Sequence, residues 1–245
     1  MGSQGTSRVV VQDSVSGREF DWPIPGQVHQ TSLRWWPDGK SVIVRRAGAR
    51  PGSSVVERRE AETGNVVGDI AIPGAGGDVV PTRDGSALIY TRANEVREWR
   101  LADGQDRVLM TIEKPWFLIQ PSGLSVTRDG QQLAVTVARR EPLVTAARLL
   151  SRPAAVEREI GLQKNLTPVG WAEGGRVLLA MIPDATGDGR GQLLAYDLES
   201  NTSRSLGLFA EQLRHFRLHP DERQILFSAG QSRLEYWWLV NADRE

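Results

Sequence analysis

A short turn signal that returns at a nearly constant interval constrains this fold more than any other feature of the sequence. The pairs DG, DG, DG, GG and DE stand at residues 38–39, 84–85, 129–130, 174–175 and 221–222, at successive intervals of 46, 45, 45 and 47 residues. An apolar segment precedes each pair and another follows it, which is the pattern of a β-hairpin. Asp-Gly also supplies the positive φ that a tight turn requires. The sequence therefore predicts five copies of one hairpin, and the last has the weakest turn because Glu222 replaces glycine.

A second series of turns lies between the first. Thr63-Gly64, Asp103-Gly104 and Ser200-Asn201 each separate two alternating apolar runs, and Ser16-Gly17 does the same near the N-terminus. Each repeat thus contains two hairpins, or four strands in about 45 residues, which are the dimensions of a β-propeller blade. We therefore predict an all-β propeller of four-stranded antiparallel blades, with residues 1–245 as a single domain and 1–7 as a disordered or vector-derived start.

A helix in the third repeat and a β-sandwich fold are the two alternatives to this arrangement. The segment 144–163 has alanine and leucine at helical spacing, but Pro153 would break a helix there, and its position matches the outer hairpin of the third repeat. A β-sandwich also uses short strands and frequent turns. The constant period of about 45 residues favours the propeller.

The strand count leaves two arrangements of the ring open. In the first, residues 19–25 form the fourth strand beside 234–240 and close a ring of five blades, with 8–13 left over or paired elsewhere. In the second, the chain is a piece of a six- to eight-bladed ring. An open sheet edge would then invite dimerisation.

Composition limits the partners and the chemistry. Thirty basic residues balance thirty acidic ones, so no global field attracts nucleic acid or an anionic membrane, although the sequence still allows a local basic patch of Arg45, Arg46 and Arg50. The chain has no cysteine, which excludes disulfides and thiolate chemistry. No run approaches the roughly 20 apolar residues that cross a bilayer, so no membrane insertion is expected.

The repeated motif resembles a known family. RWWPDGKSVIV, followed by PTRDGSALIY, VTRDGQQLAV, GWAEGGRVLLA and LHPDERQILF, is similar to the WD40-like repeat of TolB-type propellers, which is also found in the propellers of prolyl oligopeptidase-like enzymes. The last repeat resembles the closing repeat of bacterial proteins that fuse a propeller to a kinase or a DNA-binding regulator. The resemblance covers nearly the whole chain. It implies the fold and favours an extracytoplasmic or periplasmic location, but its motif residues build turns and strands and imply no chemistry.

The sequence contains no recognisable catalytic constellation. It has neither the G-x-S-x-G of a serine nucleophile nor the P-loop motif, and its histidines lack metal-ligand spacing. Asp184, Thr186 and Asp188 match positions one, three and five of a calcium loop, but position twelve is Ala195 instead of a carboxylate. We expect a structural or solvated loop there, with calcium as the weaker reading, and we expect no cofactor.

Aromatic residues and the loops that enter the inner strands supply the candidate binding site. Trp35 and Trp171 share a repeat position and are expected to pack between blades. Trp36, and one of Trp237 and Trp238, points to the opposite face from its neighbour and is expected to be either an exposed contact residue or packed against a neighbouring blade. The loop EKPWFLIQPSG, the longest into an inner strand, contains aromatic side chains that either recognise a ligand at the channel mouth or fill it. The candidate binding residues on these loops are His29, Gln30, Trp116, Phe117, Gln212 and His215.

Three functions are compatible with these features. The first is a non-catalytic binding or scaffold module, the sensory or interaction part of a larger bacterial protein, whose partner is a protein, a peptide or a small ligand. The second is a substrate-gating propeller of a prolyl oligopeptidase-like hydrolase, separated from its catalytic domain. The third, an enzyme with its active site in the channel, is disfavoured because the mouth loops lack clustered histidines and carboxylates.

Overall fold

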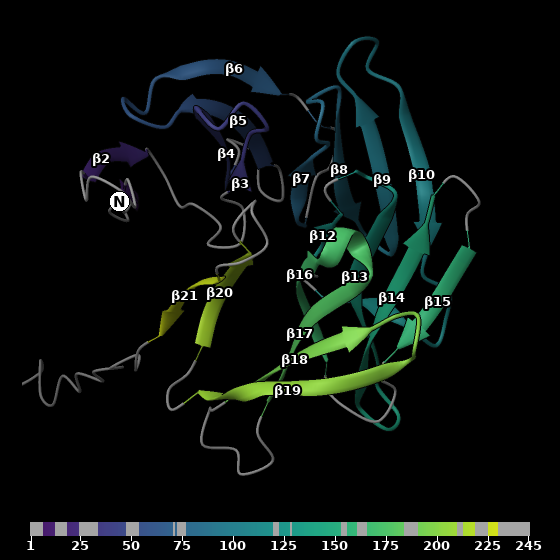
Figure 1. The fold of residues 1–245 in the computed structure, drawn as a ribbon. Coiled ribbons are helices and arrows are strands. Elements are labelled where there is room, and N and C mark those ends of the chain that lie inside the picture. Colours follow the sequence, from purple (N-terminus) through teal and green to yellow (C-terminus); the bar gives the residue numbers. More distant parts are fainter. Residues whose placement is uncertain are drawn as a thin grey trace, which may run out of the picture.

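The computed structural model consists of antiparallel sheets arranged around a common centre (Figure 1). It describes residues 7–12, 19–24, 34–47, 54–70, 72, 77–119, 123–127, 129–152, 156–160, 166–183, 191–209, 213–218 and 225–229. Apart from the 3-10 turn η1 (Glu173–Gly175), all regular structure in these ranges is β. None of the described segments forms a helix with the length and hydrophobicity to traverse a bilayer. The predicted all-β propeller fold is confirmed.

Four complete blades follow one another along the chain. Blade 1 consists of β3 (Arg34–Trp35), β4 (Ser41–Ala47), β5 (Ser54–Glu60) and β6 (Val66–Ile70). Blade 2 consists of β7 (Val79–Pro81), β8 (Ala87–Arg92), β9 (Glu95–Arg100) and β10 (Asp106–Thr111). In each, the strands are hydrogen-bonded in chain order from the innermost to the outermost.

Blade 3 divides its innermost strand in two. It consists of β11 (Phe117–Leu118), β12 (Ser125–Val126), β13 (Gln132–Arg139), β14 (Val144–Ser151) and β15 (Val156–Ile160), and both β11 and β12 pair with β13. The segment that could have been a helix is therefore the outer hairpin β14–β15, as predicted. Blade 4 consists of β16 (Thr167–Ala172), β17 (Val177–Pro183), β18 (Gly191–Asp197) and β19 (Thr202–Phe209).

Two hairpins complete the described structure. β1 (Ser7–Gln12) pairs with β2 (Glu19–Ile24), and β20 (Leu213–Leu218) pairs with β21 (Ile225–Ala229). The N-terminal hairpin, predicted about residues 16–17, is confirmed, and β1 is the partner of β2. Residues 234–240 lie outside the described residues, so the predicted pairing with 19–25 and the number of blades stay predictions.

The inner turns have the same hydrogen bonds in the first three blades. In the blade 2 turn, the N–H of Thr82 donates to the carbonyl of Ala87 at 2.9 Å, and the same backbone bond runs from Trp36 to Ser41 and from Thr127 to Gln132. Gly85 has φ +67°, as predicted for the turn. The aspartate before it accepts the N–H of Ser86 at 3.1 Å, so the Asp-Gly pair stabilises the turn through its carboxylate as well as its glycine.

Each outer hairpin is tied to the inner turn of its own blade. The residue that follows the third strand donates its N–H to a carbonyl of the inner turn at 2.6–3.0 Å, in the pairs Ala61–Lys40, Leu101–Ser86, Arg152–Gln131 and Leu198–Arg176. This backbone bond therefore joins the inner and outer turns once in each of the four blades.

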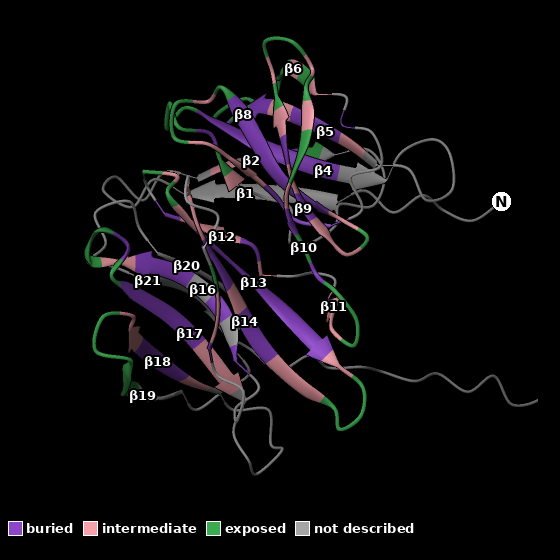
Figure 2. Cartoon of the chain, turned by 90° about the vertical axis from the view of Figure 1, so that its right-hand side faces the viewer, coloured by how far each residue is buried: buried purple, intermediate pink, exposed green. Residues whose placement is uncertain are grey.

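The core lies between blades, because both faces of each blade are covered. Alternate residues of β8 point in opposite directions: Leu88 and Tyr90 pack in a cluster with Trp36 of blade 1, while Ile89 packs in a cluster with Leu133 of blade 3. Burial on both faces explains why the strand after each inner turn is a continuous apolar run. Figure 2 shows these strands, β8, β13 and β17, as buried along most of their length.

The tryptophans at the repeat position before the inner turn differ in burial between blades 1 and 4. Trp171 is buried in the cluster between blades 3 and 4, as expected. Trp35 was expected to be core and is 52% exposed, so this prediction is wrong. Trp36, expected to be exposed or packed against a neighbouring blade, is 7% exposed and packs against blade 2. The two differ because Trp36 occupies the face that blade 2 covers, and neighbouring side chains on an extended backbone point to opposite faces.

Candidate functional site

The predicted aromatic loop enters blade 3 and is held by blade 2. Asn94, in the turn between β8 and β9, accepts the N–H of Ile112 on its backbone carbonyl at 2.8 Å and the N–H of Leu118 on its side-chain oxygen at 3.2 Å. The segment is therefore more ordered than a loop: Phe117 begins the short strand β11 and pairs with Ala138. The prediction of an irregular loop is corrected at this point.

Trp116 and Phe117 each lie beside arginine side chains. The guanidinium carbon of Arg139 is 5.5 Å from the centre of the Trp116 ring, and that of Arg148 is 5.7 Å from it. Arg140 lies 5.6 Å from the Phe117 ring. These distances are within the range of cation–π attraction. Trp116 is partly buried against the cluster between blades 2 and 3, so it also fills space in the core.

The three arginines differ in their other contacts. Arg148 Nε lies 2.6 Å from an oxygen of Glu159, so its charge is paired on the same sheet. In the described part of the chain, Nε of Arg139 is buried without a hydrogen-bond partner. Arg140 is exposed and begins the hairpin turn between β13 and β14, at whose end Leu143 is 74% exposed. We call Trp116, Phe117, Arg139, Arg140 and Leu143 the blade-3 rim.

Most of the remaining predicted site residues lie outside the part of the chain that the structure describes. His29, Gln30 and Gln212, the calcium candidates Asp184, Thr186 and Asp188, and Trp237 and Trp238 lie outside the described residues. His215 is on β20, and its side chain is not described. No group of three or more His, Asp or Glu among the described residues is arranged to hold a metal ion.

The predicted basic patch does not form around Arg45. This residue is buried on β4, at 6% exposure, and faces the charge of Asp78. Its burial lowers the pKa of the guanidinium, and Asp78 opposes that change. Asp78 is itself buried and accepts the N–H of Leu124 from blade 3 at 3.2 Å. Arg45 therefore belongs to the interior, and Arg50 lies outside the described residues.

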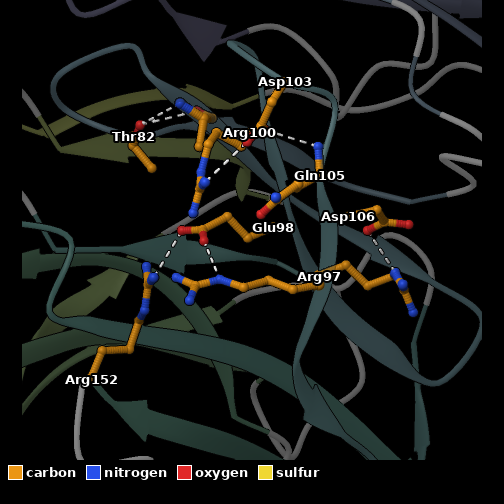
Figure 3. Close-up of polar contacts among 10 residues, drawn as sticks. Thr82, Arg97, Glu98, Arg100, Asp103, Gln105, Asp106 and Arg152 are labelled. Carbon is orange, nitrogen blue, oxygen red and sulfur yellow. Dashed lines mark hydrogen bonds and ion pairs between the residues drawn. The ribbon is translucent and has the colours of Figure 1, made fainter.

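A second polar cluster, absent from the sequence prediction, lies at the opposite end of blade 2. Glu98 on β9 is 8% exposed, and its two oxygens accept hydrogen bonds from Arg107 Nε at 2.5 Å and from Arg152 Nη2 at 2.8 Å (Figure 3). Burial of Glu98 opposes its ionisation, but these hydrogen bonds outweigh that effect and hold the pKa of its carboxyl below the usual value. Arg152 comes from blade 3, so one buried carboxylate connects two blades.

The sequence held only a weak signal for this cluster. The run EVREWR, residues 95–100, is one of the two alternating runs about Asp103-Gly104, and this alternation predicts a strand without showing which charged residue is buried. Glu98 and Arg152 are separated by 54 residues, so their contact depends on how consecutive blades pack.

Comparison with known proteins finds similarity in structure but not in sequence. No family model matches the chain, and no curated protein matches it either. Among solved structures, a putative TolB from Agrobacterium tumefaciens is similar with a TM-score of 0.72 at 15% identity, over 92% of this chain and 78% of that one. The chain has the fold of a TolB-like β-propeller. This result confirms the resemblance that the repeated motif indicated.

Enzymes share this TolB-like fold. An oligogalacturonate lyase in complex with manganese is similar with a TM-score of 0.56 at 12% identity, over 92% of this chain and 78% of that one. The tricorn protease has a TM-score of 0.56 at 10% identity, over 91% of this chain and 30% of that one. At such identities the likeness establishes the fold alone, so the function of this TolB-like propeller depends on its own surface.

Proposed function

We propose that this TolB-like propeller is a non-catalytic binding module and that the blade-3 rim is its surface for a protein partner. The observation that supports this most directly is the pairing of two aromatic rings with arginines beside a leucine that is 74% exposed. Tryptophan and arginine are the residue types that most often dominate the binding energy of protein interfaces. An exposed apolar side chain beside them supplies surface for burial.

The charges of the rim favour a partner with both acidic and apolar side chains. Among the described residues, Arg139 and Arg140 have ring contacts as their recorded side-chain interactions, whereas Arg148 is paired with Glu159. A carboxylate of the partner would accept hydrogen bonds from these guanidinium groups while their flat faces stay on the aromatic rings. Leu143 would meet an apolar side chain of the same segment.

The substrate-gating function remains the second candidate. The similarity to the tricorn protease, which this chain matches over 30% of that protein's length, supports this candidate. A gating propeller would be expected to act with a separate hydrolase domain, so a G-x-S-x-G domain encoded beside this chain would favour this second function over the first.

A displayed peptide library tests the proposal. Peptides selected on the folded chain are titrated against the original protein and against Arg140→Ser and Leu143→Ser. Both side chains are exposed, so the fold should survive, and each change should weaken binding about tenfold, as expected for a residue that contributes more than 1 kcal/mol. Val67→Ser, which alters a side chain 56% exposed on blade 1, is the matched control and should bind normally.

Two results would contradict the proposal. Equal affinity of all variants would place the binding surface elsewhere. Failure of any peptide to enrich above an empty support would argue against a peptide-binding module. Circular dichroism of each variant checks that the sheets are intact.

A further inference from the structure

A groove lies at the turn end of blade 2, at the opposite end of the strands from the blade-3 rim. It has a volume of about 550 Å³. The inner and outer turns of blade 2 and the strands next to them supply its lining, which consists of Ser86, Ala87, Glu98, Arg100, Leu101, Ala102 and Arg107. The groove therefore combines a small apolar floor with charged walls. We call it the blade-2 groove.

The charged walls carry an excess of guanidinium groups. Arg107 binds Glu98 through Nε, and its side chain is 56% exposed. Arg100 is 48% exposed and donates from Nη1 to Asp103 at 3.1 Å, and Figure 3 shows its side chain directed toward Glu98. Together with Arg152, three guanidinium groups face two carboxylates, Glu98 and Asp103, so the cluster keeps one positive charge.

The equivalent groove of the next blade shows what is different here. Arg158 pairs with Leu149 on blade 3 as Arg107 pairs with Glu98 on blade 2. With leucine in place of glutamate, Arg158 extends to blade 4 and donates to Leu198 O at 2.7 Å and to Asn201 Oδ1 at 2.5 Å. In blade 2, the hydrogen bond from Arg107 Nε to Glu98 keeps the arginine side chain at its own blade. Arg107 therefore lines the groove with a side chain that is largely exposed.

We propose that the blade-2 groove binds a carboxylate carried on an aliphatic chain, with Arg107 and Arg100 as its ligands. A planar guanidinium binds a carboxylate through two parallel hydrogen bonds. The methylene groups next to that carboxylate cover Ala87, Leu101 and Ala102. Glu98 limits the charge that can lie inside the groove: one carboxylate balances the cluster, and a second carboxylate of the ligand lies outside, at the far end of its chain. A phosphate dianion places both charges beside Glu98 and is repelled.

Two sources supply this chemistry, and the experiment separates them. A small organic acid such as glutarate has the carboxylate and the chain, and so does the glutamate side chain of a protein. Calorimetric titration of the whole chain with glutarate, with a triglutamate peptide and with inorganic phosphate compares the three. Equal dissociation constants for glutarate and for the triglutamate peptide indicate a small acid as the ligand. A much lower dissociation constant for the peptide indicates a protein ligand.

Variants of the wall residues determine whether the groove is the binding site. Arg107→Gln should weaken glutarate binding about tenfold, because one charge-assisted pair of hydrogen bonds is lost. Glu98 keeps Arg152 in this variant, so no buried charge is left alone. Glu98→Gln should instead strengthen binding several-fold, since its amide oxygen still accepts a hydrogen bond from Arg107 Nε while the negative charge of the site is removed. Arg204→Gln, on an exposed part of β19, is the control and should change nothing.

The outcomes that overturn the proposal differ from those of the peptide experiment at the rim. Unchanged binding by Arg107→Gln, weaker binding by Glu98→Gln in a folded variant, or phosphate binding as tight as that of glutarate would each refute a carboxylate site in the blade-2 groove. None of them bears on Arg140 or Leu143, because these residues lie at the other end of the strands.

Discussion

Trp36 of blade 1 lies directly against Gly85 in the inner turn of blade 2: a Cβ atom placed on Gly85 would be 3.1 Å from Cζ2 of the indole. This contact places the turn of one blade beneath the aromatic ring of the previous one. Gly85 therefore serves two purposes, because its φ of +67° suits the turn and its missing side chain makes room for the ring.

Replacement of Gly85 by alanine separates these two purposes when it is compared with Gly39. Gly39 has nearly the same φ, +66°, but a Cβ there would meet nothing within 4 Å. We expect Gly39→Ala to lower the free energy of unfolding by about 1 kcal/mol through backbone strain alone. Gly85→Ala should cost about 1 kcal/mol more because the indole must move. Urea unfolding measures both, and equal losses would show that the ring does not press on Gly85.

The tryptophan pair shows how far a repeat pattern predicts burial. The repeat gave the fold because each turn, strand and apolar run recurs within its own 45 residues. It also put Trp35 and Trp171 at one position, and this equivalence is consistent with the strand pairing of both residues. Burial depends on what covers the face to which the side chain points. Blade 3 covers Trp171, whereas Trp35 stays 52% exposed.

The candidate sites could be predicted only in part for a related reason. Trp116 and Phe117 were found because aromatic residues in a long loop are conspicuous in the sequence. Their arginine partners were missed, since Arg139 ends β13 and Arg140 begins the following turn, and both reach the rings only through the pairing of β11 with β13. The Glu98–Arg152 contact depends on the packing of two blades, which no local pattern specifies.

The aspartates of the inner turns should make stability depend on acid pH. Asp84 accepts hydrogen bonds from Ser86 Oγ and Thr82 Oγ1, both at 2.7 Å, and from the Ser86 N–H, and these lower its pKa from 3.8 to about 2. A carboxyl whose pKa is lower in the folded state stabilises the fold above its unfolded pKa and loses that contribution as the pH falls. We therefore expect this contribution to be complete above about pH 4 and to disappear between pH 4 and 2.

Asp84→Asn tests this dependence. The amide keeps an oxygen acceptor for the Ser86 N–H but has no charge to lose, so the variant should be less stable than the original protein at pH 7 and nearly equal to it at pH 2. Urea midpoints measured from pH 7 to pH 2 give the comparison. Glu62→Gln, which removes one exposed negative charge from the outer turn of blade 1, is the control. A constant difference between Asp84→Asn and the original protein at every pH would contradict the prediction.

We expect Trp22 to stabilise the packing of the N-terminal hairpin against blade 1. It is 4% exposed, donates from Nε1 to Ala61 O at 3.0 Å, and lies so close to Gly64 that a Cβ there would be 2.4 Å from its ring. Trp22→Phe removes the hydrogen bond and should cost about 1 kcal/mol or more, because Ala61 O loses a donor. Trp35→Phe is the matched control and should cost little, since that ring is half exposed. Equal urea midpoints for both variants would show that the hairpin does not depend on this contact.

The outer edges of the blades should resist pairing with another chain, and β15 offers the clearest test. The outer strands β6, β10 and β19 each skip one residue in their pairing, at Val67, Leu109 and Leu206, and such bulges disrupt a flat edge. β15 pairs with β14 without a skip, but three of its five residues are charged: Glu157, Arg158 and Glu159.

Charge on β15 should therefore replace the bulge as protection. Glu157 is exposed, and its replacement by valine puts a β-branched apolar residue on a regular edge. We expect Glu157→Val to form larger species than the original protein in sedimentation velocity at tens of micromolar, an order-of-magnitude choice for weak association. Glu157→Gln, which removes the charge without adding apolar surface, should associate much less. Identical sedimentation of all three proteins would mean that this edge is protected by something other than its charge.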